Sequence, residues 1–170
     1  MRRDGCSASS RAAPCRPTRT LRAPAGCCGA LSASDVAAVA RRYVLDTHAC
    51  VFTLTAPRKL GLEARAVLRR VEAGQAQAYV PAAVVAEVLI LRDLGRVRIG
   101  LPELRKATES APGLCFLPLD LTQLDHFAAL VTLRDPFDRL IVSAARSMGA
   151  ALVTRDCQIA DSGLVETVWS

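Results

Sequence analysis

The stretch Tyr43–Asp46, with the sequence Tyr-Val-Leu-Asp, is a short apolar run that ends in a carboxylate. Similar apolar runs recur along the chain, and one or two helical patterns separate each run from the next. Strands that alternate with helices in this way are typical of a parallel sheet covered on both faces, so an α/β fold is predicted. The predicted strands are Tyr43–Asp46, Ala76–Val80, Leu114–Leu119, Ala150–Val153 and Val165–Trp169.

Helical periodicity fills the segments between these strands, and a glycine follows several of the helical patterns, where a left-handed closing residue is favoured. The chain contains no glycine-rich phosphate loop, which argues against dinucleotide-binding and P-loop proteins. One amphipathic stretch, Leu60–Val71, either packs on the core or forms a dimer or partner surface. The predicted helices are Leu62–Val71, Ala82–Leu94, Pro102–Thr108, Gln123–Leu130 and Pro136–Met148.

Composition divides the 170 residues into an N-terminal extension, residues 1–40, and one domain, residues 41–170. The extension holds six arginines and two acids, so it carries +4 of the net charge of +6 and leaves the domain only weakly basic. A large basic patch that would grip long DNA is therefore not expected. The extension is predicted to be a disordered basic segment, an organellar leader, or the result of a start assigned too far upstream.

The seven cysteines show neither zinc-site nor disulfide spacing, so a reducing compartment is expected. Three of them lie in the domain and are predicted to be small buried apolar residues: Cys50, Cys115 and Cys157. No stretch is long enough to span a bilayer. The sequence therefore predicts a cytoplasmic protein that does not enter the membrane.

Four carboxylates lie where an apolar element ends or inside an apolar helix: Asp46, Glu87, Asp138 and Asp156. Burying an anion is costly unless a cation neutralises it, so several such acids together indicate a bound metal. In an open parallel sheet, ligands collect at the carboxyl ends of the strands, where Asp46 and Asp156 are expected. An oxygen-only ligand set favours Mg²⁺ or Mn²⁺ acting on a phosphate ester.

Each acid also has a simpler structural interpretation. Asp46 and Asp156 could merely close strands, and Asp138 could merely be a first-turn acid that complements the helix dipole. Asp135, directly before Pro136, is interpreted as a helix N-cap. Glu87 has no basic residue three or four positions away to pair with, but it reaches the strand ends only if its helix crosses over the first strand.

Several neighbours of the acids are candidates for a supporting role. Thr47 and Thr154 could each cap a turn or bond a metal-bound water. His48 is interpreted as a structural residue rather than a base, and with two histidines in the chain a histidine-rich metal site is excluded. Three arginines beside the acids are either solvated surface or a rim that grips phosphate, namely Arg134, Arg139 and Arg155.

Four motifs together resemble the PIN-domain ribonuclease toxins of the VapC type, over residues 43–170 and in the right order. They are Val44-Leu45-Asp46-Thr47-His48, Ala86-Glu87-Val88, the specific segment Arg134-Asp135-Pro136-Phe137-Asp138-Arg139-Leu140-Ile141, and Val153-Thr154-Arg155-Asp156. The resemblance implies a three-layer α/β/α sandwich with a central, mostly parallel five-stranded sheet. It also implies Mg²⁺- or Mn²⁺-dependent endonucleolytic cleavage of RNA, with transfer RNA as the family-level target, a homodimer, and neutralisation by a cognate antitoxin.

Carried over residue by residue, the resemblance assigns Asp46 and Asp138 as the principal metal ligands. Asp156 and Glu87 complete the shell, partly through water, and Thr154 orients a water beside them. All four acidic positions hold the expected residue type. Two other functions remain open. A different Mg²⁺ phosphohydrolase is disfavoured because no Asp-x-Asp pair ends the first strand, whereas a catalytically silent binding module is distinguished only by an activity assay.

Overall fold

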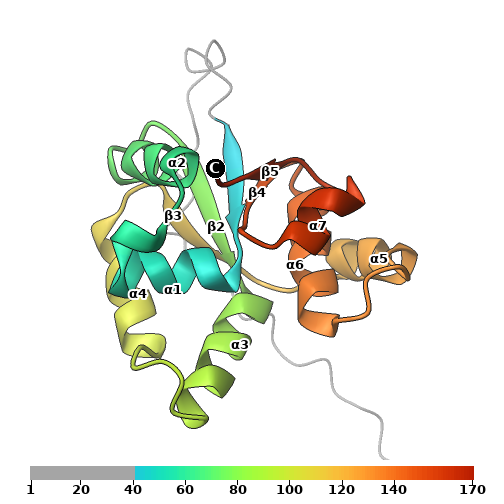
Figure 1. The fold of residues 1–170 in the computed structure, drawn as a ribbon, viewed down its shortest axis with the longest axis horizontal. Helices are drawn as coiled ribbons and strands as arrows, with labels where there is room; N and C mark the ends of the chain where they lie inside the picture. The colour runs from blue at the N-terminus through green and yellow to red at the C-terminus, as the bar shows by residue number, and fades with distance from the viewer. Residues whose placement is uncertain (1–40) are drawn as a thin grey trace, which may run out of the picture. The chain divides into compact units, whose positions relative to one another are not determined.

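The computed structural model describes residues 41–170, which contain one sheet of five parallel strands in the order β3-β2-β1-β4-β5 (Figure 1). β1 lies at the centre, and Tyr43, Val44 and Leu45 are buried there, as expected for a strand covered on both faces. The strand bounds are β1 Arg42–Leu45, β2 Gln77–Pro81, β3 Leu114–Leu117, β4 Ala151–Val153 and β5 Thr167–Val168.

Helices cover both faces of this sheet. Figure 1 shows α1 and α2 on one side of the strands and α5, α6 and α7 on the other. The predicted α/β/α sandwich around a five-stranded parallel sheet is therefore confirmed. Within residues 41–170 the helices are α1 Thr47–Thr55, the single 3-10 turn Pro57–Lys59, α2 Leu62–Glu72, α3 Ala82–Asp93, α4 Leu101–Ser110, α5 Leu121–Ala129, α6 Pro136–Ser147 and α7 Cys157–Ser162.

Two of these helices, α1 and α7, were not predicted from the sequence. The sequence of α1, Thr-His-Ala-Cys-Val-Phe-Thr-Leu-Thr, is rich in β-branched and aromatic residues that form helices weakly. Its helical state depends on burial of Thr47, Ala49 and Cys50 and on a capping carboxylate at Asp46. The first strand accordingly ends at Leu45, one residue before the predicted end.

The amphipathic stretch that begins at Leu60 forms α2, whose apolar face packs into the core through Ala64, Val67, Leu68 and Val71. Of the two interpretations of this amphipathic stretch, packing on the core therefore accounts for its apolar face. Cys50 is buried as predicted, but Cys157 is exposed, because it begins the short surface helix α7. The prediction for residues 1–40 lies outside the described residues. Within residues 41–170, no helix is both long and apolar enough to cross a membrane.

Candidate functional site

The register of the two central strands brings the first and last acidic motifs together. β1 and β4 pair with Leu45 opposite Val153, so the residues that follow these two strands are also neighbours. The hydroxyl of Thr154 donates a hydrogen bond of 2.7 Å to Oδ2 of Asp46. The Asp46 backbone N–H donates to the carbonyl of Val153 at 3.1 Å. Asp46 and Thr154 thus lie side by side at the carboxyl end of the sheet, where Asp46 was predicted.

Asp46 is a buried carboxylate, only 4% exposed, and burial raises its pKa above the usual range. Hydrogen bonds from Thr154 and from the Thr47 backbone N–H oppose this effect, as does His48, whose Nδ1 lies 4.0 Å from Oδ2. The nearby Asp156 carboxylate raises the pKa further. Asp46 is therefore a buried anion whose environment supplies too little positive charge, and a cation would be favoured beside it.

A hydrogen bond from Thr47 connects Glu87 to the carboxyl end of β1. The sequence had left two roles open for Thr47, a turn cap or a partner of a metal-bound water. The hydroxyl of Thr47, the first residue of α1, donates a hydrogen bond of 2.5 Å to Oε2 of Glu87 on α3. Since Thr47 directly follows Asp46, this contact brings α3 to the carboxyl end of β1. The crossing that Glu87 needs in order to reach the strand ends is thus present.

Helix α6 supplies the third acid. Oδ1 of Asp135 accepts hydrogen bonds from the backbone N–H groups of Phe137 at 2.8 Å and Asp138 at 3.2 Å, so Asp135 is the N-cap, as predicted. Asp138 is half-buried, and Ile141 and Ala145 on the same helical face are fully buried. Its carboxylate therefore projects from a helix that is anchored in the core.

The environment of Asp138 shows that the acids converge. Its pKa is raised to about 6, first by burial and then by repulsion from Asp135, Asp156, Asp46 and Glu87, in that order. One of these carboxylates caps the helix of Asp138 itself, and the other three come from separate segments of the chain. Mutual repulsion of this kind stores electrostatic free energy that a divalent cation would relieve.

Asp156 has a structural role that the sequence did not predict. Its Oδ1 accepts hydrogen bonds from the backbone N–H groups of Gln158 at 2.7 Å and Ile159 at 3.3 Å, which makes it the N-cap of α7. Its own N–H donates to the hydroxyl oxygen of Thr154 at 3.0 Å. Thr154 therefore bridges Asp156 and Asp46.

The fit of these acids to a metal ion rests on the chemistry of their donors. Carboxylate and hydroxyl oxygens are the ligands that Mg²⁺ and Mn²⁺ prefer. As they stand, however, no three His, Cys, Asp or Glu side chains within residues 41–170 lie close enough together to enclose an ion. Binding a shared cation would require rotation of the half-buried acids Glu87, Asp138 and Asp156 toward Asp46, which is held by hydrogen bonds.

None of the three predicted arginines forms an ion pair with an acid within residues 41–170. Arg139 turns toward α5, where its Nη2 donates a hydrogen bond of 2.6 Å to the Phe127 carbonyl and its guanidinium lies 4.0 Å from the centre of the Phe127 ring. Arg155 lies 5.2 Å from the centre of the Phe52 ring. Only Arg134 lines the same cavity as one of the four acids, Asp138.

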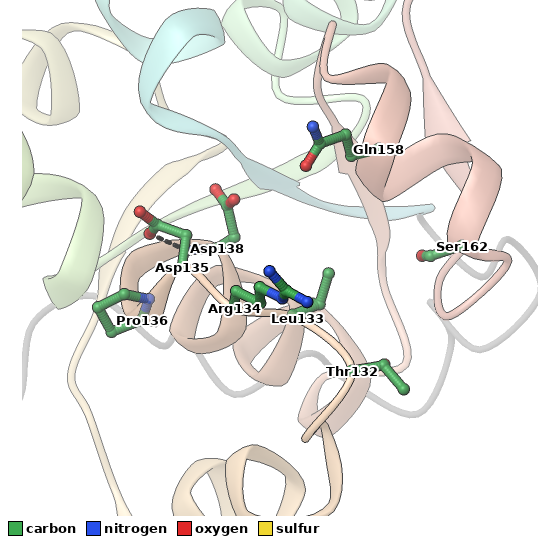
Figure 2. A pocket seen from close by; sticks show the side chains of 8 residues that line it. All are labelled: Thr132, Leu133, Arg134, Asp135, Pro136, Asp138, Gln158 and Ser162. Atoms are coloured by element: carbon green, nitrogen blue, oxygen red, sulfur yellow. Dashed lines mark hydrogen bonds between the residues drawn. The ribbon is translucent and has the colours of Figure 1, made fainter.

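This Asp138 cavity, with a volume of about 760 Å³, opens beside the start of α6 (Figure 2). In Figure 2 the carboxylates of Asp135 and Asp138 lie on one side, and Gln158 faces them from α7. Gln158 was not predicted as a site residue because a lone glutamine in a short, unpredicted helix carries no sequence signal. The cavity is lined by Thr132, Leu133, Arg134, Asp135, Pro136, Asp138, Gln158 and Ser162.

Comparison with known proteins identifies similar chains. Residues 43–162 match the family model of the PIN domain. A chain of VapBC2 from Rickettsia felis, bound to a DNA fragment from its promoter, is 18% identical and has a TM-score of 0.57 over 76% of this chain and 99% of that chain. A chain of a toxin-antitoxin complex from Klebsiella pneumoniae is 18% identical, with a TM-score of 0.51 over 74% and 95%.

A third similar chain comes from DNA-bound VapBC of Salmonella typhimurium, with 17% identity and a TM-score of 0.54 over 75% of this chain and 97% of that chain. No curated protein matches the chain. At these identities the structural likeness concerns the fold, whereas the family match over residues 43–162 covers most of β1, all of β2, β3 and β4, and the four acids, and it ends before β5.

Proposed function

This chain belongs to the PIN-domain family, and on that premise we propose that it is a metal-dependent endoribonuclease that serves as the toxin of a toxin-antitoxin pair. The observation that carries the proposal is that hydrogen bonds from Thr154 and Thr47 hold the carboxylates of Asp46 and Glu87 at the carboxyl end of β1. Burial and the repulsion of nearby carboxylates, these two among them, raise the pKa of Asp138 to about 6. Acids that repel one another at the carboxyl ends of parallel strands form a site suited to Mg²⁺ or Mn²⁺.

In this proposal Asp46 and Asp138 are the principal ligands, and Glu87 and Asp156 complete the shell. The bound ion would polarise the phosphoryl oxygen and lower the pKa of an attacking water. The protein's own groups set the geometry. Thr154 holds Asp46 through its hydrogen bond of 2.7 Å, and Asp46 is thereby fixed before substrate binds. Thr154 is therefore assigned as a positioning residue, because its hydroxyl donates to a carboxylate.

Thr47 has the same relation to Glu87 that Thr154 has to Asp46. Its hydroxyl donates to Oε2 of Glu87, so one Glu87 carboxylate oxygen is held and Oε1 accepts no hydrogen bond from residues 41–170. Such hydrogen bonds limit side-chain rotation, and a preorganised carboxylate needs less rearrangement as charge develops on the phosphate. RNA is proposed as the substrate from the family resemblance, with transfer RNA as the first candidate.

The proposed partner is an antitoxin protein. Similar chains occur in VapBC structures and in a toxin-antitoxin complex from Klebsiella pneumoniae. A site rich in carboxylates can bind an arginine or lysine side chain of the antitoxin, which would pair with two acids and displace the metal. We also propose that the protein forms a homodimer, because it resembles the PIN-domain toxins of the VapC type.

The test compares purified wild type with Asp138→Asn and Asp135→Asn on total RNA in the presence of Mg²⁺. Asp138→Asn should lower the cleavage rate by roughly 10²-fold or more, because it removes one preorganised charge from the site. Asp135→Asn should cleave almost normally, because asparagine is an equally good N-cap. Circular dichroism would confirm that both variants fold.

Three outcomes would overturn the proposal. An active Asp138→Asn protein would reduce Asp138 to a helix-terminus residue. Wild type that cleaves no RNA at any Mg²⁺ or Mn²⁺ concentration would make the chain a silent binding module. Hydrolysis of a small phosphomonoester without RNA cleavage would indicate a different phosphohydrolase.

A further inference from the structure

A second concave surface shares a wall with the acidic site. This α1 groove has a volume of about 550 Å³ and lies between α1, the 3-10 turn and the segment that follows α3. Its walls include Thr47 and His48. Thr47 bonds Glu87, and its backbone N–H donates to Oδ1 of Asp46 at 2.6 Å. The groove is therefore lined by the residue that contacts both Asp46 and Glu87.

The charge of the α1 groove is opposite to that of the acids. Three exposed cations line it, Lys59, Arg96 and Arg98, and no acidic side chain does. None of the three forms an ion pair within residues 41–170, where the contacts between basic and acidic side chains are those of Arg41 with Glu166 and His48 with Asp46. Because the domain as a whole is only weakly basic, this cluster is a local feature that favours an anionic ligand.

The backbone holds the two arginines in place. Helix α3 is closed by Gly95, whose φ of 70° is left-handed, and the Arg96 N–H then donates to the Leu91 carbonyl at 2.8 Å. Beyond this closure the chain alternates, with Val97 and Ile99 packed into the core and Arg96 and Arg98 exposed. Both guanidinium groups therefore line the groove from a segment that is anchored on each side.

An aromatic side chain completes the groove. Phe52 on α1 is half-buried, and its ring centre lies 5.6 Å from Nζ of Lys59 and 6.0 Å from the centre of the His48 ring. The attraction between the ring and the ammonium group keeps Lys59 at the groove wall. Cations arranged beside an aromatic ring are characteristic of sites that bind single-stranded nucleic acids.

We propose that the α1 groove binds the phosphodiester backbone of single-stranded RNA next to the bond that is cleaved, with Arg96, Arg98 and Lys59 contacting consecutive phosphates. This inference rests on the proposed function and adds the path of the substrate to it. With the Asp138 cavity beside the acids and the groove also adjoining them, RNA is held on more than one side of the cleaved bond. Binding on both sides of the cleaved bond suits an endonuclease, which cuts inside an RNA strand.

The test measures binding of a fluorescent 12-nucleotide single-stranded RNA to the full chain in EDTA, so that cleavage does not contribute. The double variant Arg96→Gln/Arg98→Gln should bind about tenfold more weakly at low salt, and the slope of log K against log salt should become about 1.4 units shallower, since each lost phosphate contact contributes about 0.7 on single strands. In cleavage assays with Mg²⁺ the same variant should raise KM and leave kcat near the wild-type value.

The matched control is Arg69→Gln/Arg70→Gln, which removes the same charge from the exposed end of α2, outside the groove. It should leave the salt slope and affinity close to those of the wild type. Equal affinities and slopes for the two double variants would overturn the proposal and assign the groove to a protein partner. A chain that binds RNA through the groove but never cleaves it would instead contradict the proposed catalysis and leave the groove intact.

Discussion

At the scale of single residues, Asp138 is the group on which the site's electrostatics act most visibly. Its partial burial, and after it the carboxylates of four other residues, raise its pKa to about 6, from a usual value near 3.8. Asp46 is shifted in the same direction, mainly by its own burial. In the metal-free protein the fold disfavours the ionised form of both carboxyl groups. The free energy of unfolding therefore depends on pH through both residues.

The stability of the metal-free protein should therefore fall as pH rises from 5 to 7. Folded Asp138 binds its proton more tightly than the unfolded chain does, so its contribution to stability is complete below about pH 4 and is lost as pH rises through about 6. Urea unfolding in EDTA would measure this dependence. Asp138→Asn should show a shallower decline over the same range, and parallel declines in the two proteins would contradict the assigned pKa.

At the scale of elements, capping carboxylates recur around the site. Asp46 begins α1, Asp135 begins α6 and Asp156 begins α7, and each accepts at least one backbone N–H of its helix. Capping holds these side chains at helix N-termini, where the dipole favours negative charge. Asp46 and Asp156, two of the four candidate ligands, thus also stabilise the start of a helix. Glu87 lies inside α3 instead, and its carboxylate accepts a hydrogen bond from Thr47 of α1.

The contact between α1 and α3 should be measurable as a coupling energy. Thr47→Val and Glu87→Ala remove the two partners of a hydrogen bond to a carboxylate, and a double-mutant cycle on unfolding free energies should give about 1 kcal/mol of coupling. Thr53 provides the control, because its hydroxyl donates to the Ala49 carbonyl within α1. A cycle of Thr53→Val with Glu87→Ala should give coupling near zero, and equal coupling in both cycles would refute the contact.

At the scale of the whole molecule, the proposed metal should stabilise the entire fold, because its ligands come from the segment after β1, from α3 and α6, and from the segment after β4. Such a cation joins elements from both halves of the domain. At about 100 times its Kd, Mn²⁺ should raise the free energy of unfolding by about 2.7 kcal/mol.

In a thermal unfolding experiment this corresponds to a rise in Tm of roughly 5 to 10 °C for a domain of this size. Asp46→Asn should abolish most of the rise, because it removes the most buried carboxylate of the four. Asp120→Asn is the matched control, since Asp120 caps α5 and its substitution retains a capping side chain. A rise in Tm that persists in Asp46→Asn would place the ion elsewhere.

The sequence alone determined the parallel sheet, its five strands and the position of Asp46 and Asp156 at its carboxyl end. It could do so because strand burial on both faces appears directly as apolar runs, and because all carboxyl ends of a parallel sheet face the same edge. Asp135 was likewise predictable, since an acid before a proline at the start of a helix is a local signal.

Only the tertiary structure decided which neighbours meet. The bond between Thr47 and Glu87, the turn of Arg139 toward α5 and the joining of Asp46 to Asp156 through Thr154 all connect separate segments. Helix α1 likewise forms from residues of weak helical propensity because the core buries one of its faces. These features depend on how helices cross the sheet, and local periodicity carries no information about that geometry.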